Sequence, residues 1–186
     1  MHVNRTDAGA MALLHHRCYV GCMTAPILSL VDAAAHWPAR GALVGLDLGT
    51  KTIGVAASDP DRRLAAAVET IARKSFTADA ARVLALAAER RAVGLVLGLP
   101  VNMDGSEGPR AQSARSFARN LSRATDLPIS LWDERLSTAA VERQLIAADV
   151  SRAKRAAIID AHAAAYILQG ALDRLARLAS RDGDHL

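Results

Sequence analysis

The chain has 186 residues and a mass of 19.6 kDa, which is enough for one α/β domain with a full core and too little for two. Hydrophobic residues make up 51%, but no run approaches the roughly 20 uninterrupted apolar residues of a membrane helix, so we expect a soluble, cytoplasmic protein without membrane contacts. The net charge of +4 gives a mild bias toward polyanions. Aromatic residues are only 3%, which disfavours binding of single strands by base stacking and leaves backbone contacts and metal chemistry.

The N-terminal part differs in composition from the rest of the chain. We expect an extension that is partly disordered, with a short helix near residues 27–36. Both cysteines, Cys18 and Cys22, lie in this part, but their spacing lacks the paired knuckle of a structural zinc site, so neither zinc nor a disulfide is predicted. The predicted organisation is an extension over residues 1–40, one domain over residues 41–180 and a tail over residues 181–186.

Residues 42–59 have the pattern of a β-hairpin. An apolar run and an alternating segment flank a Gly-Thr-Lys corner, and Asp47 lies at the end of the first, buried strand. A carboxylate in that position needs compensation, which a divalent metal or a turn hydrogen bond to its own backbone would supply. Thr50 and Lys51 at the corner add donors that suit a phosphate oxygen. Both interpretations of Asp47 are open at this point.

The segments after the hairpin complete a predicted sheet and its helices. A third strand continues the meander, a helix leads by a right-handed crossover to an apolar strand parallel to the first, and a second helix leads to a fifth strand. We therefore predict an α/β fold with a five-stranded mixed sheet, order 3-2-1-4-5, flanked by helices. A helix from Ser137 or Thr138 to Ala148 and a last helix over residues 154–179 follow. The segments between are a strand over 64–71, a helix over 77–91, a strand over 92–99, a helix over 109–124 and a strand over 128–132.

Acidic residues follow the carboxyl ends of several predicted strands. Asp47 ends the first strand, Glu107 lies in the glycine-rich loop after the fourth, and Asp133 follows the fifth. Asp160 shares a helical stripe with small residues and points inward, either as a salt-bridge partner of an arginine such as Arg155 or as a metal ligand. Carboxylates without Cys or His select Mg²⁺ or Mn²⁺ rather than zinc. Convergence of these acids would support metal-dependent hydrolysis of a phosphodiester bond.

Four ordered motifs make this interpretation more specific: residues 45–59, 98–109, 133–138 and 160–169. Together they resemble the YqgF/RuvX family of ribonuclease H-like nucleases, whose members are described as Holliday junction resolvases and as pre-16S rRNA nucleases. The resemblance spans residues 41–173 and implies a ribonuclease H-like nuclease domain, a hydrolase acting on ester bonds. Members often carry Arg where this chain has Thr52, so the basic contact near the first motif is expected either to be weakened or to be supplied by Lys51.

The resemblance also implies the residues of the site. It assigns Asp47, Glu107 and Asp160 as catalytic ligands of Mg²⁺ or Mn²⁺, with Asp133 as a further catalytic member. Basic and polar residues around this edge of the sheet are expected to contact nucleic acid. These are Thr50, Lys51, Arg110, Arg135 and Lys154.

Several functions compete at this stage. Processing of the 5′ end of pre-16S rRNA in ribosome biogenesis is favoured, which makes structured RNA the expected partner. The alternative among the nucleases is resolution of Holliday junctions, with branched DNA as the partner. Resolution needs a two-fold dimer with two sites, and both a monomer and a homodimer are open for this chain. An ATP-binding actin-like protein would need two such halves, and this chain has room for one. A non-catalytic RNA-binding assembly factor is the remaining alternative.

Overall fold

The computed structural model describes residues 24–136 and 152–183, with side chains over 24–136 and 160–180. The helix predicted from Ser137 or Thr138 to Ala148 lies outside these residues, as do both cysteines. The described elements are β1 (Ile27–Leu28), α1 (Leu30–His36), β2 (Ala42–Leu48), β3 (Thr52–Ser58), β4 (Ala65–Ala72), α2 (Phe76–Glu89), β5 (Ala92–Leu99), α3 (Pro109–Ser122), β6 (Ile129–Asp133), the 3-10 helix η1 (Glu134–Leu136) and α5 (Arg152–Gly183).

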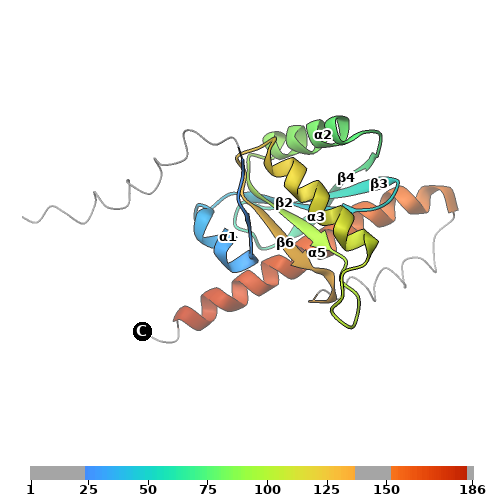
Figure 1. The fold of residues 1–186 in the computed structure, drawn as a ribbon. Coiled ribbons are helices and arrows are strands. Elements are labelled where there is room, and N and C mark those ends of the chain that lie inside the picture. Colours follow the sequence, from blue (N-terminus) through green and yellow to red (C-terminus); the bar gives the residue numbers. More distant parts are fainter. Residues whose placement is uncertain (1–23, 137–151, 184–186) are drawn as a thin grey trace, which may run out of the picture.

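The strands form one mixed sheet of six strands in the order β1-β6-β5-β2-β3-β4 (Figure 1). β2, β5 and β6 run parallel, and β2, β3 and β4 form an antiparallel meander. The predicted order 3-2-1-4-5 is confirmed for β2 to β6, whereas the predicted count of five strands is wrong by one. The extra strand β1 pairs with β6 through only two residues, which is too short to leave an alternating pattern in the sequence.

The segment before β2 differs from the single helix expected over residues 27–36. Its first residues form β1, and α1 begins at Leu30, where the Ser29 hydroxyl accepts a hydrogen bond from the Asp32 backbone N–H at 3.2 Å. The helix ends before Trp37, the residue that precedes a proline and is therefore biased toward extended backbone. Leu30 and Trp37 are buried against the sheet, so this segment contributes to the core.

Helices cover both faces of the sheet. α2 and α3 lie on one face, called here the α3 face, and α1 and α5 lie on the other, called here the α5 face (Figure 1). Along β2, Leu46 and Leu48 belong to the core on the α3 face, whereas Leu43 packs with α5. A Cβ atom at Gly45 would also meet a side chain of α5. Because side chains alternate along a strand, Asp47 lies on the α5 face.

α5 is the longest element and crosses β2, β3 and β4. Its buried stripe consists of small and aliphatic residues, including Ala164, Ile167 and Ala171, which lets the helix approach the sheet closely. The helix extends beyond the predicted range of 154–179 at both ends. No helix in the described part of the chain is both long and apolar enough to cross a membrane.

Candidate functional site

The predicted acids gather at one edge of the sheet. The parallel strands β2, β5 and β6 end there at Leu48, Leu99 and Asp133, and the antiparallel strand β3 begins there at Thr52. In sheets of this kind, the carboxyl ends of parallel strands are where ligands bind. The question that decides the site is therefore which face of the sheet each acid occupies.

Asp47 and Asp160 share the α5 face. Asp47 is 7% exposed and lies opposite Gly54 on the neighbouring strand. Gly54 in turn touches α5, because a Cβ atom there would overlap the carbonyl oxygen of Asp160. The hydroxyl of Thr52 donates a hydrogen bond of 2.6 Å to Oδ2 of Asp160. The absence of a side chain at Gly54 thus allows the helix that carries one acid to approach the strand pair that carries the other.

Glu134 is a third acid on this face, and the sequence reasoning missed it. It begins η1 directly after β6, is 8% exposed, and lies against Gly98, where a Cβ atom would be 2.7 Å from its Oε1. Gly98 follows Leu97, which pairs with Leu46, so Gly98 and Asp47 are next to each other on β5 and β2. Three carboxylates, Asp47, Glu134 and Asp160, therefore lie on one face over two glycines. The signal was present in the sequence, because Glu134 is two residues after the core residue Trp132 and shares its face.

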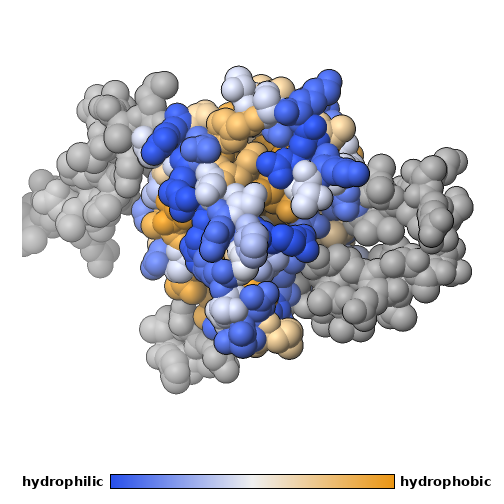
Figure 2. Space-filling view, turned by 45° about the vertical axis from the view of Figure 1, so that its right-hand side comes forward, coloured by the Kyte–Doolittle hydropathy of each residue, from blue (hydrophilic) through white to orange (hydrophobic). Residues whose placement is uncertain are grey.

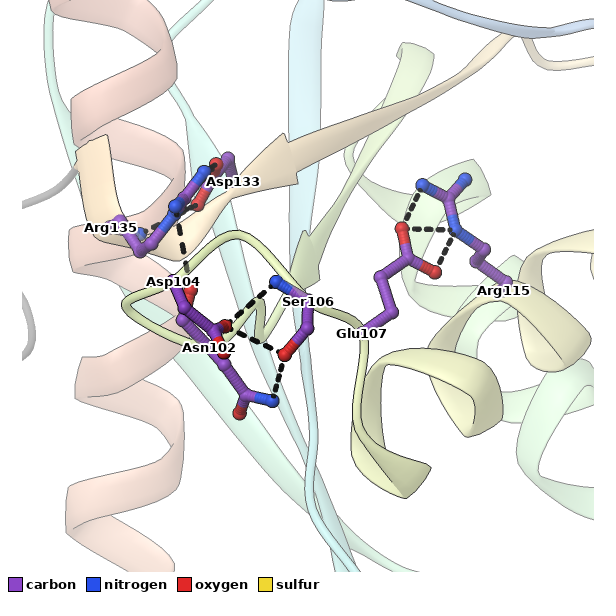
Figure 3. Close-up of polar contacts among 7 residues, drawn as sticks. All are labelled: Asn102, Asp104, Ser106, Glu107, Arg115, Asp133 and Arg135. Carbon is purple, nitrogen blue, oxygen red and sulfur yellow. Dashed lines mark hydrogen bonds and ion pairs between the residues drawn. The ribbon is translucent and has the colours of Figure 1, made fainter.

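Asp133 lies on the opposite face of the sheet. It continues the row of Ile129 and Leu131, which pack in the core of the α3 face. Its carboxylate pairs with Arg135, with a distance of 2.6 Å from Nη2 to Oδ2, and it also accepts from the Arg135 backbone N–H (Figure 3). Hydrogen bonds from Arg135 hold the pKa of Asp133 below its ordinary value. The structure does not bring Asp133 together with Asp47, and its catalytic role stays a prediction.

Glu107 is also separate from the acids of the α5 face. It ends the loop between β5 and α3, where Nε of Arg115 donates to its Oε2 at 2.7 Å. Figure 3 shows its carboxylate turned toward Arg115 on α3. Hydrogen bonds from Arg115 lower the pKa of Glu107. Glu107 and Asp133 line one open pocket together with their two arginines, and a role for Glu107 as a metal ligand stays a prediction.

The basic and polar candidates surround this edge. Thr50 and Lys51 are exposed on the turn between β2 and β3, and Arg110 is exposed at the start of α3. Neither Lys51 nor Arg110 forms an ion pair with a residue that the structure describes. Arg135 is engaged by Asp133, and the side chain of Lys154 lies outside the described part.

Arg73, which directly follows β4, was not predicted as a site residue. It supports the turn between β2 and β3. Its Nη1 donates to the carbonyl oxygen of Gly49 at 2.8 Å, and its backbone N–H donates to the carbonyl oxygen of Lys51. An ion pair of 3.7 Å joins it to the buried Asp79. Arg73 thereby fixes the corner that presents Thr50 and Lys51. Long-range contacts of this kind leave no local pattern in a sequence.

The donor chemistry of the α5 face suits a hard cation. Among the side chains that the structure describes, no three His, Cys, Asp or Glu residues lie close enough to hold a metal ion by themselves. Mg²⁺ is commonly bound by one or two carboxylates and completes its shell with water and substrate phosphate oxygens. Asp47, Glu134 and Asp160 offer oxygen donors of this type on one face, so the residues fit such an ion.

Comparisons of the chain with known proteins find a matching family model and similar relatives. The model of the RuvX family, described as Holliday junction resolvase, matches residues 41–174. A relative from Rhodopseudomonas palustris (strain TIE-1) named "Putative pre-16S rRNA nuclease" is 81% identical over 156 residues, which is 84% of this chain and 98% of the relative. A relative of the same name from Nitrobacter winogradskyi is 78% identical over 154 residues, 83% of this chain and 94% of its own length. The solved structure of T. thermophilus RuvC in complex with Holliday junction substrate is 13% identical, with a TM-score of 0.46 over 75% of this chain and 97% of that one.

Proposed function

The chain belongs to the RuvX family, and from this membership we propose that it is a nuclease that hydrolyses phosphodiester bonds with divalent metal ions. Each ion would be held by one or two of the carboxylates of Asp47, Glu134 and Asp160, together with water and substrate phosphate oxygens. The observation that supports this site is the position of the three carboxylates on one face of the sheet, at the carboxyl edge, over Gly54 and Gly98. Two of them are less than 10% exposed, so the elements that carry them fix their positions.

The residues of the chain have separate tasks in this proposal. When bound, Mg²⁺ or Mn²⁺ supplies Lewis-acid activation of water and of the phosphoryl oxygens. Asp47, Glu134 and Asp160 supply the oxygen ligands, and Thr52 orients Asp160 through its hydrogen bond of 2.6 Å. Lys51 and Arg110, both exposed, neutralise phosphates on either side of the scissile bond. Any catalytic role of Glu107 and Asp133 would be exerted from the α3 face, where Arg115 and Arg135 pair with them.

The substrate that we propose is structured RNA, specifically the 5′ end of pre-16S rRNA in ribosome biogenesis. The name that both reported relatives carry supports this choice, and we propose a cytoplasmic location with it. The description of the family model supports a second candidate, resolution of four-way DNA junctions. That reaction requires two active sites related by a two-fold axis, so it also requires a homodimer.

Cleavage assays on both nucleic acids test the proposal. Purified protein is incubated with labelled pre-16S rRNA and, separately, with a four-way DNA junction, each with Mg²⁺, Mn²⁺ or EDTA, beside the Asp47→Asn variant. We expect metal-dependent cleavage of the RNA that EDTA and Asp47→Asn both abolish. Cleavage of the DNA junction alone would favour the resolvase. RNA binding without cleavage by either protein would favour the assembly factor and contradict the nuclease.

A further inference from the structure

Met103 is the most exposed of the large hydrophobic residues that the structure describes. Its exposed fraction is 89%, compared with 71% for Leu64 and 68% for Leu136. It lies in the loop between β5 and α3, which projects from the carboxyl edge of the sheet (Figure 1). Figure 2 shows hydrophilic residues interspersed with apolar ones on the side that is turned forward. Its place in the loop at this edge, beside the proposed site, puts Met103 where a bound substrate would meet the protein.

The loop holds Met103 in place with an internal hydrogen-bond network. The N–H of Gly105 donates to the carbonyl oxygen of Asn102 at 2.9 Å, which closes a turn with Met103 inside it. Oδ1 of Asp104 accepts from the backbone N–H and the hydroxyl of Ser106, at 2.9 and 2.7 Å (Figure 3). Gly105 adopts a φ of +86°, which residues with a side chain rarely adopt. The exposure of Met103 is therefore built into a defined turn.

The turn is also attached to the proposed active site. Nη1 of Arg135 contacts the carbonyl oxygen of Asn102 at 3.4 Å, and Arg135 directly follows Glu134 in η1 (Figure 3). At its start, the loop follows the strand that contains Gly98, against which Glu134 lies. Both connections tie the position of Met103 to the carboxylates on the α5 face.

We propose that Met103 is an apolar wedge that inserts into the open base step at the end of a paired RNA stem and thereby sets which phosphate reaches the acids. Proteins use unbranched or branched apolar side chains, Met included, to unstack base steps, and the cost is lowest where the stack is already interrupted. Met adapts well to such a task because its side chain is flexible and polarizable. This inference rests on the proposed function, because it assigns the substrate feature that the same site reads.

The test uses a fluorescent base and protein that binds without cutting. The probe is an RNA hairpin with a 5′ single-stranded extension and 2-aminopurine at the last paired position, titrated with the Asp47→Asn variant. We expect fluorescence to rise on binding, because the wedge unstacks the base. Adding Met103→Ala to this variant should remove most of the rise and weaken binding about 10-fold, because an apolar side chain is no longer buried against the base.

Four substitutions control for exposure, side-chain shape and the backbone conformation of the loop. Leu64→Ala shortens an exposed apolar side chain at the other end of the sheet, next to β4, and should leave the fluorescence and affinity unchanged. Met103→Leu keeps an apolar side chain and should retain most of the signal. Gly105→Ala should lower the signal because φ of +86° becomes strained, whereas Gly108→Ala, at φ −78°, should not.

The outcomes separate this inference from the proposed function. A full fluorescence rise with Met103→Ala, or no RNA binding at all, overturns the wedge. A rise seen only with 2-aminopurine at the centre of a four-way DNA junction overturns the assignment to RNA. If the signal depends on Met103 but wild-type protein cuts no RNA, the wedge stands and the nuclease proposal fails. If wild-type protein cuts the RNA without any change in fluorescence, the nuclease stands and the wedge fails.

Discussion

At the same edge of the sheet, the acids on its two faces have different surroundings. On the α5 face, Asp47 and Glu134 are buried and lie beside glycines that bring backbone and helix close. On the α3 face, Glu107 and Asp133 are each engaged by an arginine a few residues away in the chain. The difference teaches that acids at the ends of neighbouring strands do not form one site merely because they share an edge. The face on which each acid lies decides which other acids it can join in holding a metal ion.

The largest expected effect comes from removing a charge on the α5 face. Asp160→Asn should lower the rate of metal-dependent RNA cleavage on the order of 10³-fold, because a lost ligand forfeits several kcal/mol of transition-state stabilisation. Single-turnover kinetics at saturating Mg²⁺ measure it. Glu107→Gln is the matched change on the α3 face and should cost less than about 10-fold. Equal losses in both variants would mean that the two faces act as one site.

A methyl group placed under Glu134 should have the next largest effect. In Gly98→Ala, the new Cβ atom would lie 2.7 Å from Glu134 Oε1 and from Ile167 Cδ1, so the carboxylate must move. We expect a loss of about 100-fold in cleavage rate, together with about 1–3 kcal/mol of stability. Gly45→Ala creates a similar overlap of 2.7 Å with Leu168 Cβ. This control should lose stability but keep most activity, and a similar loss of activity in both would remove the special role of Gly98.

The hydrogen bond from Thr52 to Asp160 should have a smaller effect. Thr52→Val keeps the shape of the side chain and removes the donor of the 2.6 Å hydrogen bond. We expect about a 10-fold increase in the Mg²⁺ concentration needed for half-maximal cleavage, as for other residues that orient a metal ligand. Thr50→Val, an exposed position on the same turn, should leave the Mg²⁺ dependence unchanged. An unchanged Mg²⁺ requirement in Thr52→Val would show that Asp160 needs no such orientation.

The smallest expected effect is on the pH dependence of the free energy of unfolding, and it comes from an ion pair on the α3 face. Arg135 holds the pKa of Asp133 in the folded protein below its ordinary value of 3.8. The pair therefore stabilises the fold at pH values above 3.8, and this contribution disappears as the pH falls through the lower, folded-state pKa. We expect the contribution to be about 0.5 kcal/mol because the pair is partly exposed. Urea unfolding of wild-type protein and Asp133→Asn should differ by this amount at neutral pH and converge in strong acid.

Much of the fold follows from sequence patterns. Apolar runs and alternation define β2 to β6, and the small-residue stripe around Ala164 places α5 on the sheet. β1 escapes such reasoning because a strand of two residues has no periodicity, and it exists only because β6 offers an edge to pair with. Strand order, by contrast, follows from short connections and right-handed crossovers.

The candidate site follows from the sequence only in part. The strand ending at Asp47 and the helical stripe of Asp160 point to a shared face, and the structure brings them together through Gly54. Asp133 and Glu134 both lie at the end of β6, so counting acids at strand ends does not distinguish them. Only the alternation of side chains along β6, followed from its buried residues, assigns the two acids to opposite faces of the sheet. The pairing of Glu107 with Arg115 joins a loop to a helix eight positions further on, which no local pattern reveals.

Glu134 and Asp133 are adjacent in the chain and lie on opposite faces of the sheet, so they provide the sharpest test of the assigned site. The measurement is the single-turnover rate of pre-16S rRNA cleavage in Mg²⁺ for Glu134→Gln and Asp133→Asn, with thermal unfolding as the check that both proteins fold. We expect Glu134→Gln to lose roughly 10³-fold and Asp133→Asn to keep its rate within about 10-fold. The opposite ranking would place the metal site on the α3 face and contradict the assignment to Asp47, Glu134 and Asp160.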